Sequence, residues 1–410
     1  MSARRALAAC LVCMTMSVRI QAADSGRVAP LSLITMVLAM LLLPGCMSVR
    51  WGLQAVDGQM DVLARRSNID KLLADPHTPD SLREKLRLAQ SIREYAVHEL
   101  GLPDTDSYRS YADLGRSAAV WSVVAAPADA LQPKTWCFLF VGCLAYRGWF
   151  DPHDAWHEAR LLQRRQGLDV MVSPATAYST LGWFDDPLTN IMLEYPAPQL
   201  AQLLFHEMSH EQLYLKGDTA FNEAYATAVA EIGVARWLDS RNLAASAENY
   251  RQQAQVDAMV DGWIAAAREQ LLRIYQAPGT AEQKALGKQG VIAALRQRWL
   301  AAMLHSQPGS LLHTGLRRWR GWFAQPLNNA HFVLHATYQQ GVQRMLRLYA
   351  DLDEDLPAFY RATAAMAEWS VAQRATWLAA TTSAEASMPD VSSQAASAQR
   401  AVQQGGQRLQ

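Results

Sequence analysis

The stretch "LLFHEMSHEQLYLKGDTAFNEAYATAVAE", Leu203 to Glu231, contains the pattern H-E-x-x-H at His206, Glu207 and His210. On a helix, two histidines four residues apart lie on one face, one turn apart, so both imidazoles can reach a single metal ion. Glu207 lies beside that face, where it can polarise a metal-bound water. The alternative is an ordinary polar stripe on two surface helices, but burying these groups beside an apolar helix face is costly unless something pairs with them.

Glu223 is the third candidate ligand. Gly217 is expected to end the first helix in a left-handed cap, and Asp218 or Thr219 can cap the start of the next helix. Two helices joined by so short a turn run antiparallel and adjacent, which brings Glu223 back toward the histidines. The sequence therefore predicts a His₂Glu set with an open fourth position, as in catalytic rather than structural zinc sites.

Glu231 is the rival ligand on the same predicted helix. It follows Glu223 by eight residues, about 12 Å along the helix axis, which places it beyond the histidines. We therefore expect Glu231, like Asn222, to support the ligands from outside the first coordination sphere.

The composition permits a large folded chain and gives no basic surface for nucleic acid. The chain has 410 residues, of which 50% are hydrophobic, and its formal net charge is zero. This length suits one large domain or two ordinary ones. Lys and Arg are spread along helical stretches, which argues against a nucleic-acid partner.

The N-terminal region resembles an export signal. The apolar run from Pro30 to Leu43 is too short for a spanning helix and ends in "LPGC", which resembles a bacterial lipoprotein box with Cys46 as the lipidated residue. Pro44 departs from the small or hydroxyl residue usual there. We expect residues 1–45 to form a leader, within which the true signal peptide begins near Arg27. An uncleaved membrane anchor is the alternative.

Two cysteines remain in the mature chain, Cys137 and Cys143. An exported compartment is oxidising, which favours a short-loop disulfide between them. Two free buried thiols are the alternative, and the spacing is poor for zinc.

Hydrophobic periodicity indicates an α+β fold that is mostly α. We expect a helix over 81–102, three to five strands within 118–184 interrupted by a helix over 152–166, and helices from 198 onward. The helical segments are placed at 198–216, 219–239, 242–276, 280–305, 311–322, 326–350 and 356–381. A sheet-containing half (46–197) and a helical half (198–380) then form one domain, and 381–410 is a disordered tail.

The order of these elements resembles the zincin metallopeptidases, in which a small mixed sheet lies over the H-E-x-x-H helix and a helical subdomain forms the other wall of the cleft. "NEAYA", 222–226, is similar to the N-E-[GA]-[FY]-A stretch of gluzincin aminopeptidases. "SYRSYADL", "CFLFVGCLAYRGWF", "YSTLGWFDDPL" and "PLNNAHF" resemble a family of bacterial lipoproteins called putative aminopeptidases, over about residues 40–370. The gap between His210 and Glu223 is shorter than in well-known gluzincins, and no G-x-M-E-N stretch is present.

Further residues are expected to contact a peptide substrate. Zinc peptidases hold an extended substrate along an edge strand and stabilise the oxyanion with a polar side chain. We expect Tyr338 to donate to the oxyanion, and the expected substrate contacts are Tyr178, Ser179, Thr180, Asn328 and Asn329. His153 and His157 share the four-residue spacing without an intervening acid and are interpreted as a solvated pair.

The leading hypothesis is a zinc-dependent peptidase held by a lipid anchor in a Gram-negative cell envelope, on the periplasmic side of the outer membrane. The competing hypothesis is a non-hydrolytic envelope lipoprotein that binds peptides or a partner. Glu207 favours the enzyme, because a binding module has no use for that carboxylate. The sequence leaves open the substrate, the end from which it is cut and the oligomeric state.

Overall fold

A computed structural model describes residues 47–138, 142–177 and 184–380. Contacts divide the chain into two units, Met1–Arg50 and Trp51–Gln410, and the sheets and nearly all of the helical residues belong to the second unit. The expected leader, Cys46 and the expected tail from 381 lie outside the described residues. No helix in the described ranges is both long and apolar enough to cross a membrane.

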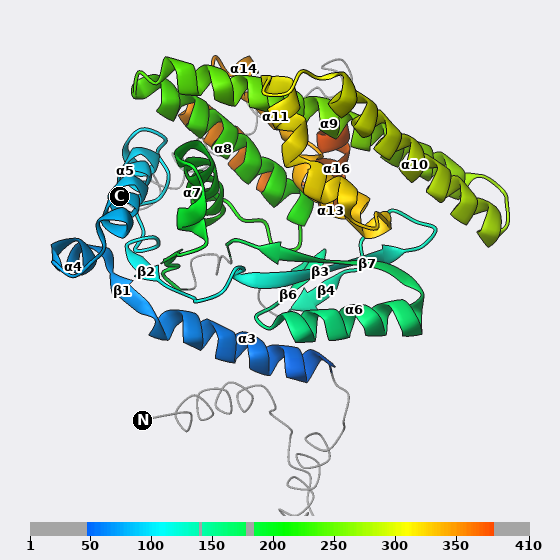
Figure 1. The fold of residues 1–410 in the computed structure, drawn as a ribbon, viewed down its shortest axis with the longest axis horizontal. Helices are drawn as coiled ribbons and strands as arrows, with labels where there is room; N and C mark the ends of the chain where they lie inside the picture. Colours follow the sequence, from blue (N-terminus) through cyan, green and yellow to red (C-terminus); the bar gives the residue numbers. More distant parts are fainter. Residues whose placement is uncertain (1–46, 139–141, 178–183, 381–410) are drawn as a thin grey trace, which may run out of the picture. The chain divides into compact units, whose positions relative to one another are not determined.

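The first half of the described chain mixes helices with short strands (Figure 1). Its helices are α3 (Met47–Ala64), α4 (Ile69–Ala74), α5 (Asp80–His98), α6 (Pro152–Gln166) and the 3₁₀ turn η1 (Met192–Glu194). Its strands are β1 (Arg66–Asn68), β2 (Ser110–Ala112), β3 (Val120–Pro127), β4 (Trp136–Phe138), β5 (Gly142–Leu144), β6 (Tyr146–Trp149), β7 (Leu168–Ala175) and β8 (Leu188–Thr189).

The second half is helical throughout. It contains α7 (Ala197–Gln212), α8 (Thr219–Ser240), α9 (Ala244–Gln276), α10 (Ala281–His305), α11 (Leu311–Arg318), α12 (Arg320–Ala324), α13 (Asn329–Gln339), α14 (Val342–Asp351), α15 (Leu356–Ala365), η2 (Met366–Glu368) and α16 (Val371–Ala379). The prediction of a mostly helical α+β fold with small mixed sheets is confirmed.

The central sheet has the strand order β6-β3-β7 and is antiparallel throughout. Val124 of β3 lies opposite Tyr146 of β6 on one side and Met171 of β7 on the other. Two smaller sheets, β1-β2-β8 and β4-β5, accompany it. The strands β3 to β7 confirm the three to five strands expected within 118–184, of which 178–183 lie outside the described residues.

The two faces of the central sheet are covered differently. α13 packs on β3 and β7, and α6 packs against all three strands from the opposite face. Glu158 of α6 is buried, accepts hydrogen bonds from the indoles of Trp136 and Trp149, and forms an ion pair with Arg147 of β6 at 3.1 Å. Removing one member of such a buried network leaves its partners unpaired, so this network fixes α6 to the sheet.

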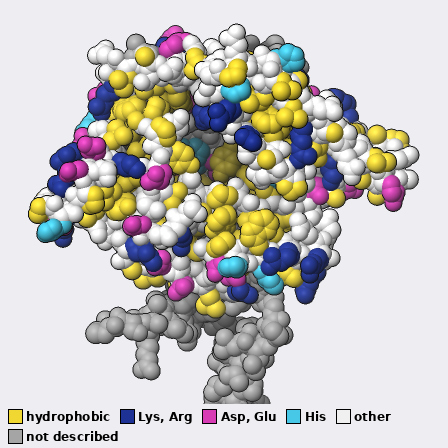
Figure 2. Space-filling view, in the orientation of Figure 1, with side chains coloured by type: hydrophobic (Ala, Val, Ile, Leu, Met, Phe, Trp, Pro, Cys, Tyr) yellow, Lys and Arg dark blue, Asp and Glu magenta, His cyan; other side chains and the backbone are white. Residues whose placement is uncertain are grey.

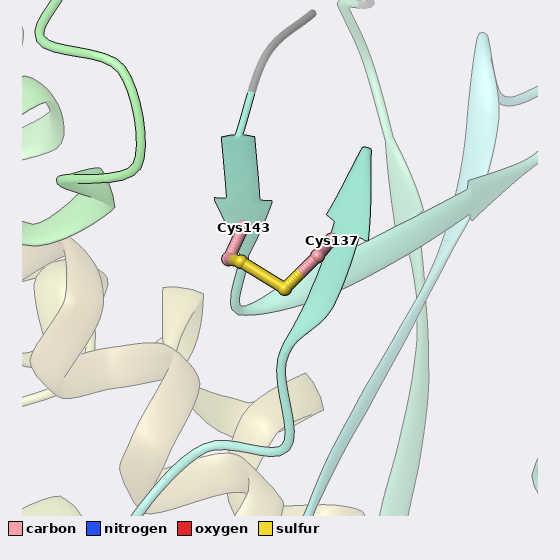
Figure 3. Close-up of a disulfide and its surroundings, with 2 residues drawn as sticks. All are labelled: Cys137 and Cys143. Atoms are coloured by element: carbon pink, nitrogen blue, oxygen red, sulfur yellow. A yellow bond between two sulfur atoms is a disulfide. The ribbon is translucent and has the colours of Figure 1, made fainter. Parts of the chain in front are cut away.

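A disulfide closes the β4–β5 hairpin. Cys137 and Cys143 lie directly opposite each other, with Cα atoms 3.8 Å apart (Figure 3). The short-loop disulfide expected from the sequence is therefore present. Gly142 beside it has a positive φ of 83°, and a Cβ there would lie 2.8 Å from the backbone nitrogen of Gly217. The hairpin thus touches the loop that joins α7 to α8.

The predicted helix over 326–350 is wrong in one respect, because it breaks between α13 and α14. Gly341 has a φ of 93°, which side-chain-bearing residues rarely adopt, and a Cβ there would clash with Leu378 of α16. The break therefore lets α16 approach closely.

Two buried hydrophobic clusters hold the helical half together, one around α5, α7 and α8 and one between α9–α13 and the sheet.

Candidate metal centre

Adjacent helices carry the three candidate ligands. α7 presents His206 and His210, and α8 presents Glu223 in its second turn. His206 Nε2 lies 3.2 Å from His210 Nε2 and 3.2 Å from Glu223 Oε2, and His210 Nε2 lies 3.8 Å from the same carboxylate oxygen. Within the described ranges, they form the one group of three or more His, Cys, Asp or Glu whose ligand atoms could share an ion.

These separations fit a zinc ion. Tetrahedral zinc with bonds of about 2.0–2.1 Å holds neighbouring ligand atoms about 3.3–3.4 Å apart. The Oε2 atom of Glu223 is buried and accepts no hydrogen bond of good geometry, although His206 is close. A buried carboxylate oxygen without a partner is costly, and a cation between it and the two imidazoles would remove that cost. Burial also lowers the pKa of His210 to about 4, which favours the neutral imidazole that a metal needs.

The loop before α8 brings Glu223 into place, although not by the predicted path. α7 ends at Gln212 rather than continuing to residue 216. The side chain of Asn222 accepts a hydrogen bond from the backbone N–H of Leu215 and donates one to its carbonyl, at 2.8 and 2.9 Å. These bonds hold the loop in a non-helical form. Asn222 thus supports the site through the loop rather than through a ligand.

Asp218 fixes the start of α8. Its carboxylate accepts a hydrogen bond from the backbone N–H of Phe221 at 3.2 Å and another from Arg374 Nε at 2.6 Å, and the side chains of Asp218 and Arg374 are each 6% exposed. The pair ties the turn between the ligand helices to α16.

We expect Asp218→Ala to lower the free energy of unfolding by about 3–5 kcal/mol, because it removes a helix cap and leaves Arg374 buried without its partner. Chemical denaturation measures this change. Asp239→Ala, at an exposed aspartate near the end of the same helix, is the control and should change little. A loss below about 1 kcal/mol for Asp218→Ala would contradict the role of the pair.

Glu207 is half-buried beside the three ligands. Burial raises its pKa to about 7, and the charges of Glu223, Asp186 and Glu211 act in the same direction, against His206. A carboxyl group with a pKa near neutrality can both accept and release a proton, as a general acid–base group must.

Tyr108 lies next to Glu207, and no sequence pattern predicts this. Burial, followed by the charge of Glu207, raises the pKa of Tyr108 well above its usual range. Its φ of 63° is unusual for a tyrosine. The backbone N–H of Tyr108 donates to the carbonyl of Asp186 at 2.6 Å, and Gln90 donates to the carbonyl of Tyr108 at 2.8 Å. These hydrogen bonds hold the strained backbone in the conformation that brings the phenol near the carboxylate of Glu207.

Tyr338 of α13 lies beside His206. Its ring centroid is 6.5 Å from that of His206, and the charge of Glu223, followed by burial, raises its pKa well above its usual range. Tyr146 of β6 also acts on the Tyr338 hydroxyl, and Tyr214 lies beside His210 with ring centroids 6.4 Å apart. The structure therefore places Tyr338, the expected oxyanion donor, beside the group of His206, His210 and Glu223, which we call the metal-type cluster. Tyr214 is a second tyrosine beside this cluster.

Asn328 and Asn329 bond to the sheet rather than facing a substrate. Asn328 caps α13 and donates to the carbonyl of Val170 at 3.0 Å. Asn329 is fully buried, donates to the carbonyls of Pro127 and Ala130, and accepts from the hydroxyl of Tyr275. Their hydrogen-bonding groups are therefore used to dock α13, and with it Tyr338, on the sheet. The structure gives both residues a positioning role, and the substrate contact expected for them stays a prediction.

Glu231 lies away from the ligands. Burial raises its pKa to about 7, and the charges of Asp261 and Asp257 of α9 add to the effect. Asp261 in turn accepts from His335 at 2.7 Å. The structure thus places Glu231 against α9, and its expected contact with a ligand histidine is not among the contacts of the described residues. Tyr178, Ser179 and Thr180, the other expected substrate contacts, lie outside the described residues.

One indirect signal in the sequence points to Tyr108 and Asp186, which were not predicted as site residues. Tyr108 stands in "SYRSYADL" and Asp186 in "YSTLGWFDDPL", two of the stretches that carry the family resemblance. Nothing in their spacing links them to Glu207, because the link is made through a loop contact between distant segments.

The viewed face of the molecule is hollowed between the helical layer and the sheet, and hydrophobic side chains lie in the hollow (Figure 2). The cluster combines two imidazoles, a carboxylate without a good partner and an adjacent acid–base group. The two imidazoles and the carboxylate could hold a metal ion. Residues 51–378 match the family model described as "Putative aminopeptidase", and the chain belongs to this family. Membership of the family supports a peptidase activity.

No curated protein and no solved structure was found to match the chain.

Proposed function

We propose that this protein is a zinc-dependent, gluzincin-like peptidase in which His206, His210 and Glu223 hold the metal. The observation that carries the proposal is the convergence of these three ligand atoms beside the half-buried carboxylate of Glu207. A bound zinc ion would supply Lewis-acid chemistry, polarising a peptide carbonyl and lowering the pKa of water.

The protein's own residues then move the proton and stabilise the charge. Glu207 accepts the proton that the attacking water loses and passes it to the amine that leaves. The hydroxyl of Tyr338 donates a hydrogen bond to the carbonyl oxygen as it becomes negative. Tyr108, next to Glu207, helps to hold the carboxylate in place.

A chelation experiment tests the proposal. Purified protein incubated with a peptide mixture should release new amino termini, and 1,10-phenanthroline should abolish that release. Adding zinc back after removal of the chelator should restore it. Hydrolysis that is unaffected by loss of all bound metal would refute a metal-dependent mechanism.

We expect Tyr338→Phe to lower kcat about 10²–10³-fold with zinc content and KM little changed, because it removes one donor to the oxyanion. Steady-state kinetics on a peptide found in the mixture measure this change. Tyr214→Phe is the matched comparison, since Tyr214 is also an aromatic neighbour of a ligand histidine. If the large loss occurs in Tyr214→Phe and not in Tyr338→Phe, the oxyanion donor is wrongly assigned.

We further propose that the enzyme is a lipoprotein of a Gram-negative cell envelope, anchored through Cys46 to the outer membrane and facing the periplasm. The "LPGC" sequence after the apolar run supports the anchor, and the disulfide suits an oxidising compartment. Loss of residues 1–45 removes four arginines and one aspartate, which leaves a net charge of −3. Anchoring then depends on acyl chains, of which more than one is needed for stable attachment.

A further inference from the structure

The first helix of the described chain carries an exposed apolar line. Leu53, Val56 and Met60 of α3 are 69%, 58% and 54% exposed. Their spacing of three and four residues places them along one side of the helix. The other side is bonded to the sheet, because Trp51 Nε1 donates to the carbonyl of Gly148 at 2.8 Å and Gln54 accepts from the backbone N–H of Phe150 at 2.9 Å. The helix is therefore held with this apolar line outward.

The outer side of α6 carries basic and aromatic side chains. Trp156 is 48% exposed. From residue 157 to the end of the helix, the exposed ionisable side chains are His157, Arg160, Arg164 and Arg165. The acidic residue in this segment, Glu158, faces inward to Arg147. The three arginines make the C-terminal part of α6 locally positive, whereas the exposed Asp151 precedes α6 and the exposed Asp57 follows Val56 on α3.

A single side chain shows that both helices cover the same face of the sheet. The guanidinium of Arg147 lies 5.6 Å from the ring centroid of Trp51 of α3 and 3.1 Å from the carboxylate of Glu158 of α6. Figure 1 shows α3 and α6 on the same side of the sheet, and α13 on the other. Alternation along β6 points the preceding residue, Tyr146, toward the opposite face, where it acts on Tyr338.

The chain itself indicates what covers this surface. Cys46 immediately precedes α3, and Leu53 follows it by seven residues, which span at most about 25 Å in any conformation. A lipid anchor at Cys46 therefore holds the apolar line within reach of the bilayer surface. Tryptophan and arginine are side chains that settle at the headgroup level, with apolar side chains of an interfacial helix below it.

We propose that the outer surface of α3 and α6 is a membrane-docking face, on which the anchored enzyme lies against anionic phospholipid. This inference rests on the lipid anchor of the proposed function. The line of Leu53, Val56 and Met60 enters the headgroup region, and Trp156 and the arginines of α6 contact the headgroups. The metal-type cluster lies across the sheet from this face, because α13, which carries Tyr338, covers the other side.

Environment-sensitive labels test the docking face. With Cys46 acylated and Cys137 bonded to Cys143, an introduced cysteine is the reactive thiol of the mature chain. Full-length lipidated Leu53→Cys and Met60→Cys proteins are labelled with a fluorophore and reconstituted into vesicles of phosphatidylethanolamine and phosphatidylglycerol. Leu304→Cys, at an 83% exposed leucine of α10, is the matched control.

Brominated phospholipid should quench most of the emission from labels at positions 53 and 60 and little of that at position 304. Equal, weak quenching at all three positions would overturn the docking face. Labels on α3 that are buried against protein rather than lipid, as judged in vesicles without brominated phospholipid, would also overturn it. Mass spectrometry of the parent protein and its partition into detergent are read separately. Absence of acyl chains on Cys46 would refute the anchor and the inference with it, whereas an acylated parent with water-exposed labels would refute the docking face alone.

Discussion

Glu207→Gln is expected to lower kcat by about 10²–10⁴-fold while the protein keeps its metal. The amide has nearly the shape of the carboxylate but cannot accept the proton from water. Because Glu207 is adjacent to the three ligand atoms without being one of them, zinc content should stay at the wild-type level. Peptide hydrolysis and metal analysis on the same samples measure both quantities.

Glu211→Gln is the matched control, one turn further along α7. Glu211 accepts a hydrogen bond from the hydroxyl of Thr105 at 2.7 Å, and this bond can form with an amide oxygen as well. We expect activity within a few-fold of wild type. A Glu207→Gln protein as active as wild type would contradict the acid–base role. Absence of hydrolysis in the wild type, with zinc bound, would favour the competing hypothesis of a peptide-binding lipoprotein.

Glu223→Ala should cost the protein most of its zinc and, with it, all measurable hydrolysis. Loss of a supporting group around a metal typically weakens binding about 10–100-fold, and loss of a direct ligand should exceed that. His206→Ala and His210→Ala should behave in the same way. Zinc per chain after dialysis against a weak chelator measures the loss, and circular dichroism reports whether the helices remain folded.

Glu231→Ala separates the ligand from its rival on the same helix. Glu231 lies against Asp257 and Asp261 of α9 rather than against the histidines, so its removal should leave zinc content unchanged. If Glu231→Ala lost zinc while Glu223→Ala kept it, the ligand assignment would be wrong.

The candidate ligands could be predicted from the sequence because their arrangement is local. His206 and His210 share a helix face at any position in a fold, and a short connection between two helices leaves few places for Glu223. The prediction depended little on the exact end of α7. The helix stops four residues earlier than expected, because the side chain of Asn222 competes for the backbone groups of Leu215.

Contacts between distant segments could not be predicted in this way. Tyr108 reaches Glu207 through a left-handed backbone conformation held by the carbonyl of Asp186, and no hydrophobic period encodes such a contact. Asn329 matches a family stretch, which suggested substrate binding, but its partners are carbonyls about 200 residues away, at Pro127 and Ala130. A resemblance thus identified the important residue, and the structure was needed to assign its role.

The proposed chemistry depends most on one zinc ion bound between α7 and α8. X-ray absorption spectroscopy of purified wild-type protein, with metal analysis of the same sample, tests this claim most directly. We expect about one zinc per chain, with two imidazole nitrogens at about 2.0–2.1 Å and oxygen in the remaining positions. A protein that binds no zinc after zinc is supplied, or whose zinc shell lacks imidazole, would contradict the proposed metal centre.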